Sequence, residues 1–114
     1  MILPLNSSVS AINAVFKMQD ILAHNVANSN TDGFKSSVAS TEENKNGGVT
    51  VTLRQNPQPG AVYDKGDGTE AESSNVNYAR EAVNQINART QLAANIAALK
   101  TSDGMYKSVI DIMA

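Results

Sequence analysis

Apolar residues in the last third of the chain recur at the spacing of one long helix. From Asn75 to Ala114 they lie three and four positions apart, proline is absent and glycine occurs once, at Gly104. Two stripes result, one residue out of phase with each other. The first consists of Val76, Ala79, Val83, Ile86, Ala93 and Ala97. The second consists of Leu92, Ile96, Leu99, Tyr106, Ile110 and Met113. A helix over residues 75–112 would be roughly 57 Å long, so part of it is expected to be buried by another molecule.

A second helix is predicted near the N-terminus. The residues at 6–8, Asn-Ser-Ser, are suitable N-caps, and the apolar pattern after them stops near Asn28. Its apolar positions are Val9, Ile12, Val15 or Phe16, Leu22 and Val26. Lys17 and Asp20 are the only charged residues within it. This polar face, poor in charge, suits a helix that packs against protein on several sides.

The middle of the chain contains the alternation of a short strand. Val49 to Leu53 alternates apolar residues with threonine and is followed by Pro57, Pro59 and Gly60. We expect this strand to pair with a second one at 61–63. The segments 36–48 and 64–74 are polar and rich in turn residues, and they are predicted to be loops. The predicted fold class is therefore mainly α, with two long terminal helices and a small β-ribbon insert.

The expected organisation is one structural domain in three parts: residues 1–30, 31–74 and 75–114. The insert is long enough to return the chain, so the terminal helices are expected to pack against each other in antiparallel orientation. The residues predicted to pair the helices are Val9, Ile12, Val15, Leu22, Val83 and Ile86. The shorter N-terminal helix cannot also cover the second stripe. We therefore expect Leu92, Ile96, Leu99, Tyr106 and Ile110 to contact another subunit.

One glycine interrupts the long C-terminal helix. Gly104 costs helix stability relative to alanine. The sequence leaves two explanations open: a kink at this position, or the close approach of another backbone.

Composition narrows the function classes. Aromatic residues make up 4% of the chain, so the core of a monomer is thin and oligomerisation is expected. The net charge is -2 with scattered charges, which predicts no nucleic-acid partner. Cysteine is absent, so no disulfide or thiolate metal site is expected. We expect no membrane span, and the N-terminus lacks the pattern of a secretory signal.

No pattern of catalytic or ligand-binding residues stands out. His24 lies one turn after Asp20, but no nucleophile or oxyanion donor is marked nearby, so we interpret the two as a helix-surface pair. Four carboxylates between Asp64 and Glu72 lack the spacing of a calcium-binding loop. We predict no enzyme activity, no cofactor, no metal and no small-molecule substrate.

Two signatures at opposite ends of the chain resemble the axial proteins of the bacterial flagellum, in particular the proximal rod proteins of the basal body. The first is His24-Asn25-Val26-Ala27-Asn28-Ser29-Asn30-Thr31-Asp32-Gly33-Phe34-Lys35. The second comprises Ser74-Asn75-Val76-Asn77, Glu81, Ala88-Arg89, Ala94-Asn95, Lys100 to Asp103 and Ile110 to Ile112. His24 and Asp32 stand where that family usually has asparagine and proline.

The resemblance implies that the two terminal helices pack as an antiparallel coiled coil. It also implies a structural subunit of the flagellar rod, which polymerises through its terminal helices and transmits torque across the periplasm. Its partners would be copies of itself and other rod, hook–basal-body and export-gate proteins, and it would leave the cytoplasm by type III export without a cleaved signal peptide. It also implies that the helix-to-loop junction contacts neighbouring subunits through Asn25, Asn28, Thr31, Gly33 and Phe34. The alternative is a soluble coiled-coil adaptor or export-associated binding module that forms a small closed oligomer.

Overall fold

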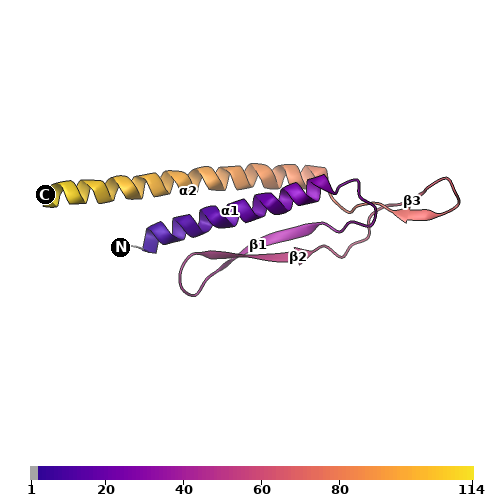
Figure 1. Cartoon of the computed structure of the whole chain (residues 1–114), viewed down its shortest axis with the longest axis horizontal. Coiled ribbons are helices and arrows are strands. Elements are labelled where there is room, and N and C mark those ends of the chain that lie inside the picture. The colour runs from indigo at the N-terminus through magenta and orange to yellow at the C-terminus, as the bar shows by residue number, and fades with distance from the viewer. Residues whose placement is uncertain (1–2) are drawn as a thin grey trace.

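The computed structural model describes residues 3–114 and shows an elongated molecule of 79 × 25 × 14 Å (Figure 1). Its elements in chain order are α1 (Leu3–Ala27), β1 (Ser37–Glu43), β2 (Val49–Gln55), β3 (Val62–Asp64), β4 (Glu70–Glu72) and α2 (Tyr78–Met113). The predicted arrangement of two long helices around a small β insert is confirmed. The N-terminal helix starts earlier than predicted, so the proposed caps at 6–8 lie inside α1. Pro4 is compatible with this start because the first turn of a helix needs no N–H partner.

α1 and α2 lie side by side and run in opposite directions (Figure 1). The end of α1 meets the start of α2: the Asn25 side chain donates a hydrogen bond to Glu81 Oε2 over 3.4 Å, and the hydroxyl groups of Ser29 and Tyr78 are hydrogen-bonded. Farther along the pair, a small apolar cluster joins the helices. It consists of Val15, Leu22 and Ala88, with Leu92 packed against it. Supercoiling of the two helices stays a prediction.

The face of α2 that packs on α1 is not the predicted one. Val83 and Ile86 are 55% and 64% exposed, so they point away from α1, contrary to the pairing prediction. The inward face instead carries Glu81 and Ala88, both buried, and Leu92, Leu99 and Tyr106, all half-buried. The apolar spacing predicted the wrong face because the face that packs on α1 includes the Glu81 carboxylate. A pattern based on apolar residues alone places a carboxylate on the solvent side.

On α1, the residues predicted to pair the helices differ in burial. Val15 and Leu22 are buried and Ile12 is half-buried, whereas Val9 is 45% exposed. These positions do not share a single face, because Val9 lies on a different side of the helix from Val15 and Leu22. The contact between the helices is therefore narrow, and much of both helices is left uncovered.

The β insert consists of two separate antiparallel hairpins. β1 pairs with β2 from Ser37↔Gln55 to Glu43↔Val49, and β3 pairs with β4 from Val62↔Glu72 to Asp64↔Glu70. The predicted loops at 36–48 and 64–74 are therefore wrong, since they contain β1 and β4. The predicted pairing of the strand at Val49–Leu53 with 61–63 is also wrong. β1 is polar and mostly exposed, so it has no apolar alternation that would mark it as a strand.

The β1–β2 hairpin packs against α1 on the side away from α2, and the β3–β4 hairpin projects beyond the end of α1 (Figure 1). Of the described elements, only α1 packs against α2. α2 continues without interruption through Gly104, and no atom of residues 3–114 comes within 4 Å of the position that a Cβ would take there. Neither of the two described helices is apolar enough over its length to cross a membrane.

The β1–β2 hairpin is attached to α1 through Ser10. Its hydroxyl donates to the carbonyl of Val49 over 2.9 Å and accepts from the Val49 amide over 3.0 Å. We expect Ser10→Ala to cost about 1 kcal/mol and to speed hydrogen exchange of the Val49 amide, measured by NMR. Ser40→Ala is the control, because the Ser40 hydroxyl bonds Thr52 within the hairpin. Equal exchange of the Val49 amide in both variants would contradict the attachment.

Candidate functional site

The most elaborate polar structure in the chain is the junction where α1 ends and α2 begins. At its centre lies Asn25, whose side chain is fully buried. Its Nδ2 donates to the Ser37 carbonyl over 2.8 Å, and its Oδ1 accepts from the Ser37 amide over 2.9 Å. Nδ2 also reaches the carboxylate of Glu81, which is 2% exposed. The side-chain amide of Asn25 thus connects α1, β1 and α2. Its hydrogen bond to Glu81 offsets part of the free-energy cost of burying that carboxylate.

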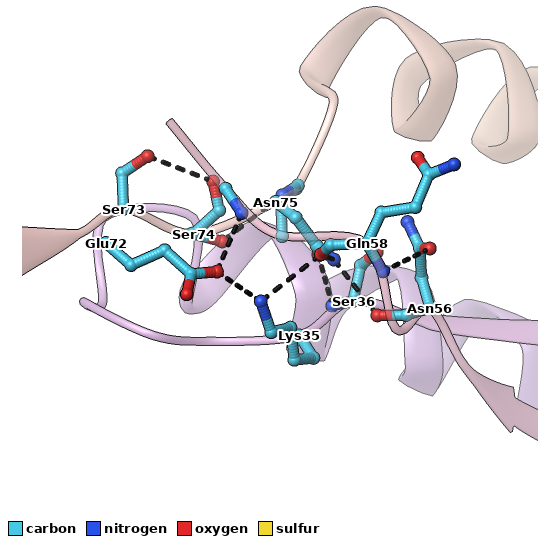
Figure 2. Close-up of polar contacts among 10 residues, drawn as sticks. Lys35, Ser36, Asn56, Gln58, Glu72, Ser73, Ser74 and Asn75 are labelled. Carbon is cyan, nitrogen blue, oxygen red and sulfur yellow. Dashed lines mark hydrogen bonds and ion pairs between the residues drawn. The ribbon is translucent and has the colours of Figure 1, made fainter. Parts of the chain in front are cut away.

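A second asparagine ties the segment before α2 to the insert. Asn75 Oδ1 accepts from the Ser36 amide over 2.6 Å, while Nδ2 donates to the carbonyls of Asn56 and Gln58 over 3.0 and 2.7 Å (Figure 2). The Asn75 amide itself donates to the Phe34 carbonyl over 3.2 Å. Its side chain therefore pairs with backbone groups from two segments of the insert, at Ser36 and at Asn56 and Gln58.

An ion pair closes the far side of the junction. Lys35 Nζ binds Glu72 Oε1 and donates to the Gln58 carbonyl over 3.2 Å, so it lies between these two residues (Figure 2). Glu72 Oε1 also accepts from the Gly60 amide over 2.7 Å. The hydrogen bond from Lys35, followed by that from Gly60, holds the pKa of Glu72 below its ordinary value. The backbone adds a bond of 2.7 Å from the Gly33 amide to the Glu72 carbonyl.

The remaining signature residues shape the loop that follows α1. Asn28 Nδ2 donates to the His24 carbonyl over 2.9 Å, which caps the last turn of the helix. Thr31 Oγ1 donates to Asn28 Oδ1, and the Phe34 ring meets the His24 ring edge-on at 5.5 Å between centroids. Gly33 has a φ of 69°, in the left-handed region that glycine favours.

These positions differ in whether they are available to another subunit. Asn25 is fully buried inside the chain, so the structure assigns its side chain to the internal junction rather than to a subunit contact. Thr31 and Gly33 are exposed, and Asn28 and Phe34 are half-buried. The predicted contact of these four with a neighbour therefore stays a prediction.

The apolar positions predicted to contact another subunit also divide into two groups. Leu92, Leu99 and Tyr106 are half-buried on the α1-facing side, whereas Ile96 is 37% and Ile110 63% exposed. Ile110 belongs to the α1-facing stripe but lies in the last turn of α2. The C-terminal end of α2 extends past the N-terminal end of α1 (Figure 1). Ile96 and Ile110 are therefore the members of this group that remain open to a partner.

The chemistry of the junction is structural. Its side chains are amides, hydroxyls and carboxylates that are already paired with Lys35 or Asn25. Among the described residues of the junction, no nucleophile is placed beside a base. Within residues 3–114, no group of three or more histidine, cysteine or acidic side chains is arranged to hold a metal ion. The sequence pattern missed the roles of Lys35, Glu72 and Gly60, because their partners are distant in sequence. Asn75 belonged to the second signature, but its role in the junction did not follow from its position.

Two family models match this chain. Residues 5–35 match a model described as flagella basal body rod protein, and residues 70–112 match one described as flagellar basal body rod FlgEFG protein C-terminal. No curated protein matches the chain as a relative. The matched segments together cover about two thirds of the sequence, and the junction joins them through Asn25, Lys35, Glu72 and Asn75. This chain belongs to the flagellar basal-body rod protein family and is a structural protein.

Proposed function

We propose that this chain polymerises through its terminal helices into the axial rod and transmits torque across the periplasm. The observation that carries the proposal is the uncovered state of α2. Of the described elements, only α1 packs against this 36-residue helix. A long helix with one covered face normally buries its other apolar positions in a partner.

The outer face of α2 suits contact with further helices. It is an uncharged stripe at helical spacing, exposed along its length. Its members are Ala79, Val83, Ile86, Thr90, Ala94, Ala97, Thr101 and Gly104. Small side chains let neighbouring helices approach closely, and the exposed valine and isoleucine supply apolar surface. At Gly104 the missing side chain leaves open space within the described chain, which a neighbouring subunit could use.

The end of α2 adds a second open surface. α1 has 25 residues against 36 in α2, so roughly 16 Å of α2 has no α1 beside it. Val109, Ile110 and Met113 are 47%, 63% and 83% exposed in this part. An overhang of this kind favours end-to-end contact between successive copies.

The junction explains how such a subunit would carry load. Torque along a shaft is transmitted only if the helices of each subunit keep their relative position. Asn25 and Asn75 tie both helices and the insert together through main-chain hydrogen bonds. We propose other rod, hook–basal-body and export-gate proteins as partners, and type III export as the route to the periplasm. Family membership supports these partners and this route.

The experiment that tests the proposal replaces Ile96 or Ile110 with aspartate. We expect either change to leave the helix content of the purified chain nearly intact, because both side chains are already exposed. In an assembly, each buried aspartate would cost about 3 kcal/mol per subunit. Incorporation into isolated basal bodies and motility should therefore be lost.

Val62→Asp is the control, since Val62 is 61% exposed on the β3–β4 hairpin and lies outside the helices. This variant should assemble. Normal rod assembly by both helix variants would contradict the proposed function. A small closed oligomer of the unmodified chain, absent from basal bodies, would favour the adaptor alternative.

A further inference from the structure

The two sides of the α1–α2 pair differ in shape. On one face of the molecule, α1, α2 and β1 enclose a groove of about 340 Å³, named here the hairpin-side groove. Its apolar floor comes from Met18, Ile21 and Leu22 of α1, and Val38 of β1 is 45% exposed at its edge. Arg80 lies at the end of this groove nearest the junction, because it is in the first turn of α2.

The opposite side carries a ridge. Phe16 is 51% exposed and Val9 45% exposed, and their separation of seven residues puts them on one face of α1. Phe16 precedes Met18 by two positions, so it points about 200° away from it around the helix. Asp20, one turn after Phe16, lines the separate groove between α1 and α2 with Ala23 and Arg89. Phe16 therefore lies across α1 from the hairpin-side groove, whereas Val9 also lines a second groove with Val49 to Val51 of β2.

We propose that the ridge of one copy docks into the hairpin-side groove of the next copy, with Phe16 on the groove floor and Asp20 facing Arg80. This inference rests on the proposed polymerisation and names the surfaces that make its lateral contact. The occupant is a second copy because the same chain carries both a projecting aromatic side chain and an apolar groove. In the single chain, Phe16 is 51% and Val38 45% exposed.

The charges fix the relative orientation of the two copies. From Phe16 to Asp20 the direction is one turn toward the junction, along α1. From the groove floor to Arg80 the direction is also toward the junction, because α2 runs opposite to α1. Two copies that point the same way can thus form the apolar and the charged contact together. Because ridge and groove lie on opposite sides, the contact leaves a free ridge and a free groove on every pair, so it repeats.

Cysteine cross-linking tests this contact directly, since the natural chain has no cysteine. The double variant Phe16→Cys/Val38→Cys joins the ridge to the groove, and Val38 is 45% exposed at the groove edge. Oxidation of basal bodies that contain this variant should give a ladder of dimers, trimers and longer products. The two single variants should give no ladder, and Phe16→Cys/Val62→Cys should give none either, because β3 projects at the far end of the molecule.

Charge reversal provides a second test that retains Phe16. We expect Asp20→Arg or Arg80→Asp alone to lower the fraction of chain incorporated into basal bodies about threefold. The double variant Asp20→Arg/Arg80→Asp should restore incorporation to the level of the unmodified chain. A merely structural role of either residue would not give this rescue.

The outcomes separate this inference from the proposed function. Incorporation of the chain into basal bodies without a ladder and without rescue by the double reversal would overturn the docking and leave polymerisation standing. Absence of the unmodified chain from basal bodies would overturn both. A ladder with rescue supports the docking.

Discussion

Replacement of Asn25 by leucine is expected to lower the free energy of unfolding by about 3 kcal/mol. Leucine is similar in size but cannot form the hydrogen bonds with the amide and carbonyl of Ser37. It also removes the polar neighbour of the Glu81 carboxylate, which is 2% exposed. Urea unfolding of the purified chain, followed by circular dichroism, measures the loss.

Asn13→Leu is the matched control for this experiment. It also replaces asparagine by leucine in α1, but at an exposed position. Its effect should stay within about 0.5 kcal/mol. If the stranded carboxylate causes part of the loss, Asn25→Leu/Glu81→Leu should be more stable than Asn25→Leu alone. Equal stabilities of the Asn25 and Asn13 variants would show that the junction is not held by this amide.

Gly60→Ala is expected to destabilise the chain by a similar amount, about 3 kcal/mol, through overpacking. A Cβ at this position would overlap the carbonyl oxygen of Ser73 and lie 2.8 Å from its carbonyl carbon. These are main-chain atoms, so the two backbone segments at Gly60 and Ser73 would have to move apart. The shift would break the bond of 2.8 Å from the Ser73 amide to the Ala61 carbonyl and displace Glu72 from the Gly60 amide.

Gly104→Ala is the control, because it should change the free energy of unfolding in the opposite direction. Apart from its chain neighbours and the backbone of its own helical turns, no described atom lies within 4 Å of its added Cβ, and the residue is inside α2. Alanine should therefore raise the stability of the isolated chain by up to about 1 kcal/mol. Urea unfolding compares the two variants, and NMR exchange of the Ser73 amide localises the damage. A stable Gly60 variant with a protected Ser73 amide would contradict the close approach.

The sequence by itself determined the elements whose formation depends on neighbouring positions. The spacing of three and four predicted both helices, because a helix buries one face built from residues that are close in sequence. The alternation from Val49 to Leu53 predicted β2 for the same local reason. The two end signatures also indicated the family, because each is a pattern of residue types at fixed positions along the chain.

The tertiary structure alone decided which faces and strands meet. It turned Glu81 inward and left Val83 exposed, because Asn25, 56 residues earlier, offers a buried hydrogen-bond partner. The polar β1 pairs with β2, and β3 pairs with β4, through main-chain hydrogen bonds. Main-chain hydrogen bonds do not require a particular pattern of side chains. The junction of Lys35, Glu72 and Asn75 likewise depends on contacts across 37 and 39 residues. The partners in such contacts lie far apart in sequence, so no local pattern of residues predicts them.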